Sequence, residues 1–180
     1  MQPTGLDDVD ITGWALAARA GDRTAAAAFI RATQQQVYRF LGHLVDGADT
    51  EHLTQETYLR AMRGLPRFSA RSSARTWLLA IARRVAADHV RSWRNRTTGA
   101  PAPIRPDDGS TEGMSLREML GTLPPDRREA FVATQVLGLS YAEAAEVCDC
   151  PIATIRTRVA RARADLVAAL PARGRGAAAS

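Results

Sequence analysis

Two short predicted helices with a tight break between them, from Leu139 to Arg163, constrain this sequence more than any other stretch. Ser140 and Glu143 have the spacing of a capping box, which starts the first helix. Asp149-Cys150-Pro151 then breaks it, and proline suits the first turn of the next helix. In the second helix an apolar stripe repeats at helical spacing: Ile152, Ile155, Val159 and Ala162. The arginines lie mostly off this stripe: Arg156, Arg158, Arg161 and Arg163. This pattern predicts a helix-turn-helix whose second helix enters a major groove; an amphipathic pair with a solvated charged face is the alternative.

The positive charge is concentrated in the middle of the chain. Residues 57–106 contain eleven arginines and a single acid, Asp88, whereas residues 1–56 contain four arginines and eight acids. A concentrated basic segment favours a polyanionic partner, and nucleic acid is the first expectation. All twenty-four basic residues are arginine. This bias, with the many alanines, indicates a GC-rich genome and weakens the argument from arginine content alone.

The first half of the chain predicts four helices after a flexible N-terminus. We expect them near residues 12–20, 24–45, 51–64 and 73–93, each with apolar residues at helical spacing. The third, EHLTQETYLRAMRG, can turn Leu53, Tyr58 and Leu59 inward and leave an acidic, hydrogen-bonding surface outside. Gly64-Leu65-Pro66 ends it.

A basic loop and a basic helix follow, from Arg67 to Arg94. Arginines there alternate with aromatic and small hydroxyl side chains, a combination that suits single-stranded DNA, because bases stack on rings and phosphates pair with guanidinium groups. The alternative for Trp77 is a core position with solvated arginines around it, and core is the interpretation we favour for that ring.

The remaining chain predicts a linker and a second helical unit. Residues 95–115 are rich in Pro, Gly, Thr and Asp. Short helices are expected from Leu116 and after Pro125, then the helix-turn-helix, and the end PARGRGAAAS has little to bury. We find no signal peptide and no apolar run long enough for a membrane span, so cytoplasm is the expected location. Cys148 and Cys150 are interpreted as ordinary thiols without a metal.

Catalytic patterns are absent from the sequence. It contains no Gly-rich phosphate loop, no HExxH and no nucleophile elbow. Asp88 and His89 are adjacent on a helix, so they point about 100° apart and do not form an acid–base pair. We therefore expect a binding protein without cofactor, metal or enzymatic activity.

The order of these elements resembles the extracytoplasmic-function (group 4) sigma factors of bacterial RNA polymerase, most of all their actinobacterial members. The likeness is carried by GDRTAAAAFI at 21–30, HLTQETYLRA at 52–61, LPRFSARSSARTWLLAIARRVAADHVR at 65–91, LPPDRREAFV at 123–132 and GLSYAEAAEVCDCPIATIRTRVARAR at 138–163. It implies an all-α protein with a flexible N-terminus at 1–11, sigma domain 2 at 12–94, a flexible linker at 95–115, sigma domain 4 at 116–170 and a disordered tail at 171–180.

The resemblance also implies which residues bind. The contacts with the −35 promoter element are expected from Tyr141, Thr154, Arg156, Thr157, Arg158 and Arg161. Those with the melted −10 element are expected from Arg67, Phe68, Ser69, Arg71, Ser73, Arg75, Arg83, Arg84 and Arg91. Glu51, Leu53, Gln55 and Glu56 match the surface that docks on the clamp helices of the polymerase β′ subunit, although His52 stands where the family usually has an acid.

The expected function is a promoter-specificity subunit that is monomeric when free and joins core RNA polymerase (β′ clamp helices and β flap) and promoter DNA. An anti-sigma factor is a further candidate partner. The competing hypothesis is a conventional helix-turn-helix regulator with an N-terminal sensor or dimerisation domain; such a domain has no use for the arginines at 67–94. A nucleic-acid enzyme lacks a catalytic cluster.

Overall fold

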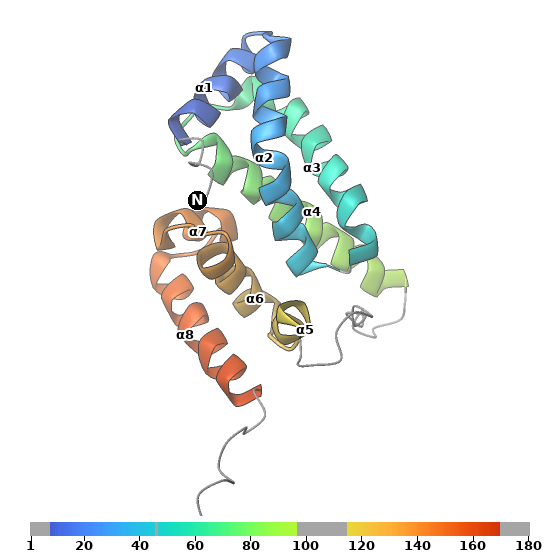
Figure 1. The fold of residues 1–180 in the computed structure, drawn as a ribbon, viewed down its shortest axis with the longest axis vertical. Helices are drawn as coiled ribbons and strands as arrows, with labels where there is room; N and C mark the ends of the chain where they lie inside the picture. The colour runs from blue at the N-terminus through green and yellow to red at the C-terminus, as the bar shows by residue number, and fades with distance from the viewer. Residues whose placement is uncertain (1–7, 46, 97–114, 170–180) are drawn as a thin grey trace, which may run out of the picture.

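The computed structural model describes residues 8–45, 47–96 and 115–169, and within these ranges the chain forms helices and turns without a strand. The helices form two units, one above the other in Figure 1. The expected all-α fold with two helical units is confirmed. Most of the expected linker, the first seven residues and the C-terminal tail lie outside the described residues. No described helix is both long and apolar enough to cross a membrane.

The first unit contains four α-helices and two short 3-10 turns: α1 (Asp8–Arg19), α2 (Arg23–Leu44), η1 (Gly47–Asp49), α3 (Thr50–Gly64), η2 (Leu65–Arg67) and α4 (Ala74–Arg96). Asp22 caps α2, because its carboxylate accepts from the backbone N–H groups of Thr24 and Ala25 at 2.8 and 3.0 Å. The helix α1 begins four residues before the expected start, and α4 continues three residues beyond the expected end.

The core of this unit comes from the stripes that helical spacing predicts. Phe29, Val37 and Leu41 of α2 and Leu78 of α4 are at most 1% exposed. Leu59 was expected to face inward and instead is 54% exposed. Helical spacing places it on the same outer side of α3 as Gln55, four residues earlier, whereas Tyr58 turns in and hydrogen-bonds Thr33 at 2.7 Å.

The second unit contains α5 (Leu116–Gly121), α6 (Pro125–Phe131), a π-type turn η3 (Val132–Val136), α7 (Tyr141–Cys148) and α8 (Ile152–Ala169). The predicted capping box is formed: Ser140 Oγ accepts from the Glu143 N–H at 3.2 Å, and the Glu143 carboxylate accepts from the Ser140 N–H at 2.7 Å. Asp149 ends α7 in a left-handed conformation with φ of 50°, which asparagine and aspartate tolerate better than other side chains. The helix-turn-helix is therefore present as α7 and α8.

The two units pack directly on each other, with α4 against α7 and α2 against α5 and α6. One hydrophobic core runs through both, from Ile11 in α1 to Leu166 in α8. The helix α8 lies on the side of the second unit away from α4 (Figure 1). This arrangement leaves the outer surface of the helix-turn-helix open.

Candidate nucleic-acid interface

The outer face of α8 carries most of the residues expected to read duplex DNA. Ile155, Val159 and Ala162 are at most 1% exposed and fix the helix on α6 and α7. Arg156, Thr157 and Arg161 consequently point to solvent, and Thr154 is half-buried. Ile152, expected on the buried stripe, is 42% exposed because it stands at the very start of the helix.

Arg158 differs from the other arginines of α8. Its Nε lies 3.3 Å from a carboxylate oxygen of Asp126, and its Nη1 lies 3.6 Å from the Cys150 sulfur. Its guanidinium group is thus already paired within the unit, so it ties α8 to α6 and to the turn. A base contact by Arg158 would require these partners to be released.

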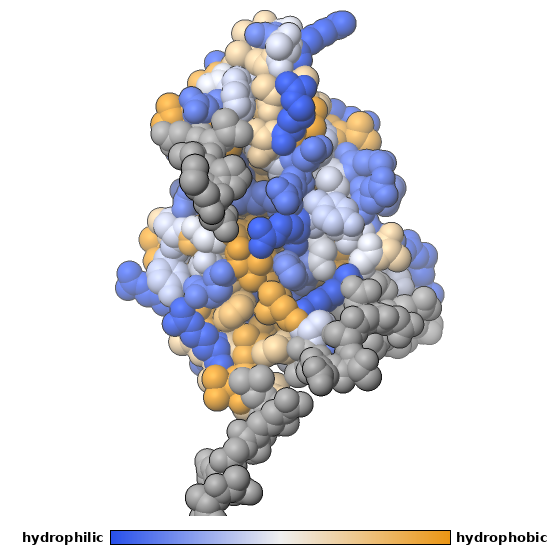
Figure 2. All heavy atoms as spheres, in the orientation of Figure 1, coloured by the Kyte–Doolittle hydropathy of each residue, from blue (hydrophilic) through white to orange (hydrophobic). Residues whose placement is uncertain are grey.

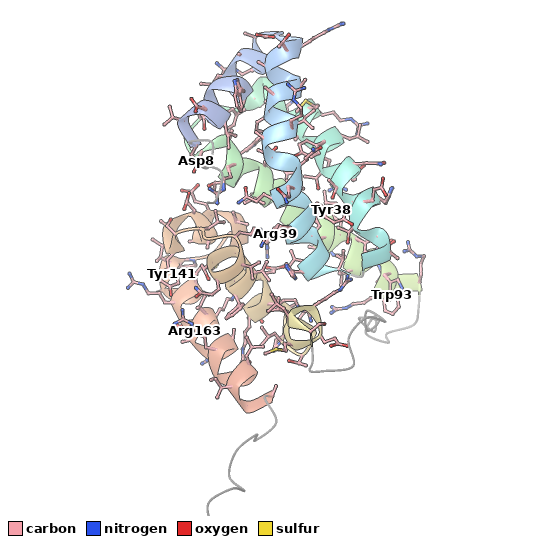
Figure 3. All side chains as sticks on the ribbon, in the orientation of Figure 1. Asp8, Tyr38, Arg39, Trp93, Tyr141 and Arg163 are labelled. Atoms are coloured by element: carbon pink, nitrogen blue, oxygen red, sulfur yellow. The ribbon has the colours of Figure 1, made fainter. Side chains whose placement is uncertain are left out.

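Tyr141 and Arg163 border the same surface. Figure 3 shows both on the outer side of the second unit, Tyr141 at the start of α7 and Arg163 on α8. Arg163 donates to the Gln135 side-chain oxygen at 2.8 Å. The open part of this surface is therefore basic and lies on a helix that is packed against α6 and α7.

The loop before α4 presents charged and hydroxyl groups around one buried ring. Arg67, Ser69 and Arg71 are exposed. Phe68 is 4% exposed and packs on Trp77, with the ring centroids 4.9 Å apart. The Phe68 ring therefore has no face free for a base, and its role is to shape the loop. Arg19 Nη1 donates a hydrogen bond to the Phe68 backbone carbonyl oxygen at 2.6 Å.

A half-open cavity of about 290 Å³ lies between α3 and α4, lined by Arg60, Gly64, Trp77, Ile81 and Arg84. It combines an aromatic ring, an aliphatic side chain and two guanidinium groups, which suits a flat base attached to a phosphate. Of these residues only Arg84 was among the expected site residues; Trp77 was favoured as core, and Arg60, Gly64 and Ile81 were not singled out. Their place in this cavity could not be predicted from the sequence, because the packing of α3 on α4 is what brings these residues together.

The four arginines of α4 that were expected to bind the −10 strand lie on two different faces of the helix. Arg84 and Arg91 are exposed, whereas Arg75 and Arg83 turn towards the second unit. Arg75 donates to the Leu137 carbonyl oxygen at 3.2 Å, and Arg83 Nε donates to the Glu129 carboxylate at 2.8 Å. Ser73 accepts from the Thr76 N–H at 3.1 Å and so caps the start of α4. Only part of the expected strand-binding set is therefore accessible.

The outer surface of α3 carries the residues expected to dock on the polymerase. Glu51 and Gln55 are exposed, and Glu56 bonds Arg60 at 2.7 Å, which in turn bonds Asp88 of α4 at 2.7 Å. Leu53 is different: it is 4% exposed and lies in the core. Its side chain supports α3 from beneath and offers no surface for docking, since residues at i and i+2 on a helix face different ways.

Both cysteines are free thiols. Burial raises the pKa of the Cys148 thiol to about 12, and the nearby Glu129 carboxylate adds to this. A thiol with such a pKa stays protonated at neutral pH and is a poor nucleophile. Cys148 is therefore a core residue of α7.

Family models match both units. The model described as sigma-70 region 2 matches residues 29–97, and the one described as sigma-70 region 4 matches residues 113–166. A Mycobacterium tuberculosis protein named ECF RNA polymerase sigma factor SigC is 52% identical over 176 residues, which cover 93% of this chain and 95% of the relative. The chain belongs to the extracytoplasmic-function sigma factors of the sigma-70 family.

Membership settles the general function. Proteins of this family are promoter-specificity subunits of RNA polymerase and have no enzymatic activity. The competing hypothesis, a regulator with an N-terminal sensor, does not account for a first unit that matches sigma-70 region 2. The first unit is therefore the sigma region 2 unit, and the second is the sigma region 4 unit.

Solved structures show the same fold. The sigma factor RpoE of Bartonella quintana, in complex with the anti-sigma factor NepR, is 28% identical with a TM-score of 0.67 and covers 76% of this chain and 91% of its own. CnrH, solved with the cytosolic domain of CnrY, is 22% identical with a TM-score of 0.69 and covers 88% of this chain and 96% of its own.

Proposed function

We propose that the second unit binds the −35 element as duplex DNA, with α8 in the major groove. The exposed Arg156, Thr157 and Arg161 support this, because arginine reads guanine edges by two parallel hydrogen bonds. Tyr141, Thr154 and Arg158 are assigned to the margin of the same contact. Arg158 has to exchange Asp126 for DNA if it takes part.

The first unit holds the melted −10 element as a single strand. The support is the cavity beside Trp77, whose ring and Ile81 offer apolar surface to a base displaced from the duplex, while the exposed Arg84 meets its phosphate. Arg60, which also lines the cavity, is paired with Glu56 and Asp88. The exposed Arg67, Ser69 and Arg71 stand at the loop that leads to this cavity, and Arg91 continues the basic surface along α4. Ser73 and Phe68 shape the loop.

Core polymerase binds at two places. The outer face of α3, with Glu51, Gln55 and Glu56, meets the β′ clamp helices. The second unit meets the β flap through apolar surface, to which Leu116 and Val167 contribute with exposed fractions of 51% and 69%. Figure 2 shows apolar side chains gathered at the surface of the second unit, below hydrophilic ones at its border with the first.

Because core RNA polymerase and promoter DNA are its partners, the protein works in the cytoplasm. We assign a monomer to the free chain. An anti-sigma factor is proposed as a regulatory partner, because the similar RpoE of Bartonella quintana was solved in complex with one. Sedimentation of the free chain checks the oligomeric state, since a dimer would contradict this assignment.

The observation that carries the proposal is the presence of two separate basic surfaces, on α8 and beside Trp77, in one sigma-family chain. Run-off transcription of fragmented genomic DNA by core polymerase, with and without the chain, tests it. Chain-dependent start sites should share two sequence elements upstream. The same start sites with core alone, or no shared elements, would contradict the proposal.

A further inference from the structure

Small apolar groups form the middle of the outer face of α8, and arginines stand on either side of them. Ala153, Thr157 and Ala160 are all exposed. Because residues four apart are neighbours on a helix, Ala153 lies beside Thr157. At about 100° per residue, Arg156 and Arg161 fall on the two sides of this pair. The face proposed to enter the major groove is therefore apolar at its centre and basic at its margins.

The hydroxyl group of Thr157 is bonded to the backbone of its own helix. Thr157 Oγ1 donates to the Ala153 carbonyl oxygen at 3.1 Å. A threonine hydroxyl has a single proton to donate, so none is left for the acceptor atoms that guanine and thymine present in the major groove. What Thr157 keeps for an outside contact is its methyl group and the lone pairs of its oxygen.

The pair stands where a recognition helix meets base edges. In helix-turn-helix proteins the N-terminal residues of the second helix contact the bases, and Ala153 and Thr157 lie in the first two turns of α8 (Ile152–Ala169). Thymine differs from the other bases in the major groove by its C5 methyl group, and alanine and the threonine methyl group recognise it by apolar contact. The chemistry of the pair therefore fits thymine.

We infer that Ala153 and the methyl group of Thr157 read the C5 methyl group of a thymine in the −35 element. This inference rests on the proposed −35 role of α8 and adds a second base to the guanine assigned to arginine. The helix rises about 1.5 Å per residue and base pairs lie about 3.4 Å apart. The thymine is therefore expected within about two base pairs of the guanine that Arg156 contacts.

Replacement of thymine by deoxyuridine removes only that methyl group and tests the inference on the full chain. The probe is a fluorescein-labelled duplex with the −35 element of a mapped promoter, in which each thymine of either strand is replaced in turn. Anisotropy should show about fourfold weaker binding for one replacement inside the element, the effect of one methyl group left unburied. A replacement outside the element is the control and should leave the affinity unchanged.

Two substitutions of Thr157 separate its methyl group from its hydroxyl group. Thr157→Ser removes the methyl group and keeps the hydroxyl, whereas Thr157→Val keeps the methyl group and loses the hydroxyl. Because Thr157 is exposed, neither change disturbs the core. The serine variant should bind the thymine duplex about fourfold more weakly than the valine variant, and it should distinguish thymine from deoxyuridine less well. The opposite order would show that the hydroxyl oxygen reads a base and would overturn the inference.

The same titrations distinguish failure of this inference from failure of the −35 role. Tighter binding to the −35 duplex than to a scrambled duplex, with equal affinity for every deoxyuridine duplex, would keep the −35 role and overturn the reading of a methyl group. Recognition of DNA shape would then account for the A·T pairs of the element. Wild-type binding that is no tighter to the −35 duplex than to the scrambled one would contradict the −35 role of α8 itself.

Discussion

Gly138, between η3 and α7, adopts a φ of +71°, and a Cβ there would meet no atom within 4 Å. Gly138→Ala therefore tests backbone strain alone, and we expect a loss of about 1–2 kcal/mol in the free energy of unfolding, measured with urea. Gly13→Ala is the control, since Gly13 lies in α1 and also has open space around it. Alanine in a helix should add up to about 1 kcal/mol. A similar change in both variants would contradict the account of Gly138.

His43, near the C-terminus of α2, makes stability depend on pH. Burial, followed by the charges of Arg39 and Arg117, lowers its pKa below the ordinary 6.5, and Figure 3 shows Arg39 on α2 near the second unit. The unfolded chain takes up the proton near pH 6.5 and the folded chain only at lower pH, so the free energy of unfolding falls as the pH drops below about 6.5. Urea titrations at pH 7.5 and 5.5 should show a larger fall for the wild type than for His43→Gln. An equal fall in both proteins would contradict this.

Single residues show where sequence reasoning was sufficient. The buried stripe of α8 follows from spacing after its first residue, so Ile155 and Val159 were predicted as core and are core. Helical spacing does not decide which of two adjacent apolar residues faces the core. For that reason the prediction that Leu59 faces inward was wrong. Trp77 is half-buried and packs against the core, which is the interpretation that the sequence favoured; it also lines the cavity, and its contact with a base stays a proposal.

Among the helices, α8 has the most direct test. Arg156→Ala should weaken binding to −35 duplex by about 1–3 kcal/mol if the guanidinium group makes two hydrogen bonds to a base. Fluorescence anisotropy with the duplex and with a scrambled −35 sequence provides the comparison. An equal loss on both duplexes would show a phosphate contact and contradict base recognition by Arg156.

The helix ends were predictable where a side chain caps them. The Ser140–Glu143 capping box and the break at Asp149 were visible in the sequence, and both are formed. The π-type turn at Val132–Val136 was not predicted, because no residue type in VATQV is a local signal for the extra residue of such a turn. The early start of α1 at Asp8 agrees with the two acids in its first turn.

At the scale of the whole molecule, the sequence predicted two units and did not predict how they meet. From the sequence alone, Arg83 is interpreted as a DNA-binding or solvated arginine, and nothing distinguishes Glu129 from a surface acid. Their pairing at 2.8 Å depends on the packing of α4 against α7, which joins residues 46 positions apart. The cavity beside Trp77 was missed for the same reason, since α3 and α4 form it together.

Strand opening is the central claim, and permanganate oxidation of promoter DNA tests it most directly, because the reagent attacks thymines that are unstacked. With core polymerase and this chain, thymines of the −10 element on the non-template strand should become reactive at mapped promoters. Arg84→Ala, which alters the cavity beside Trp77, should reduce that reactivity while −35 binding stays unchanged. Reactivity no higher than with core polymerase alone would contradict the account.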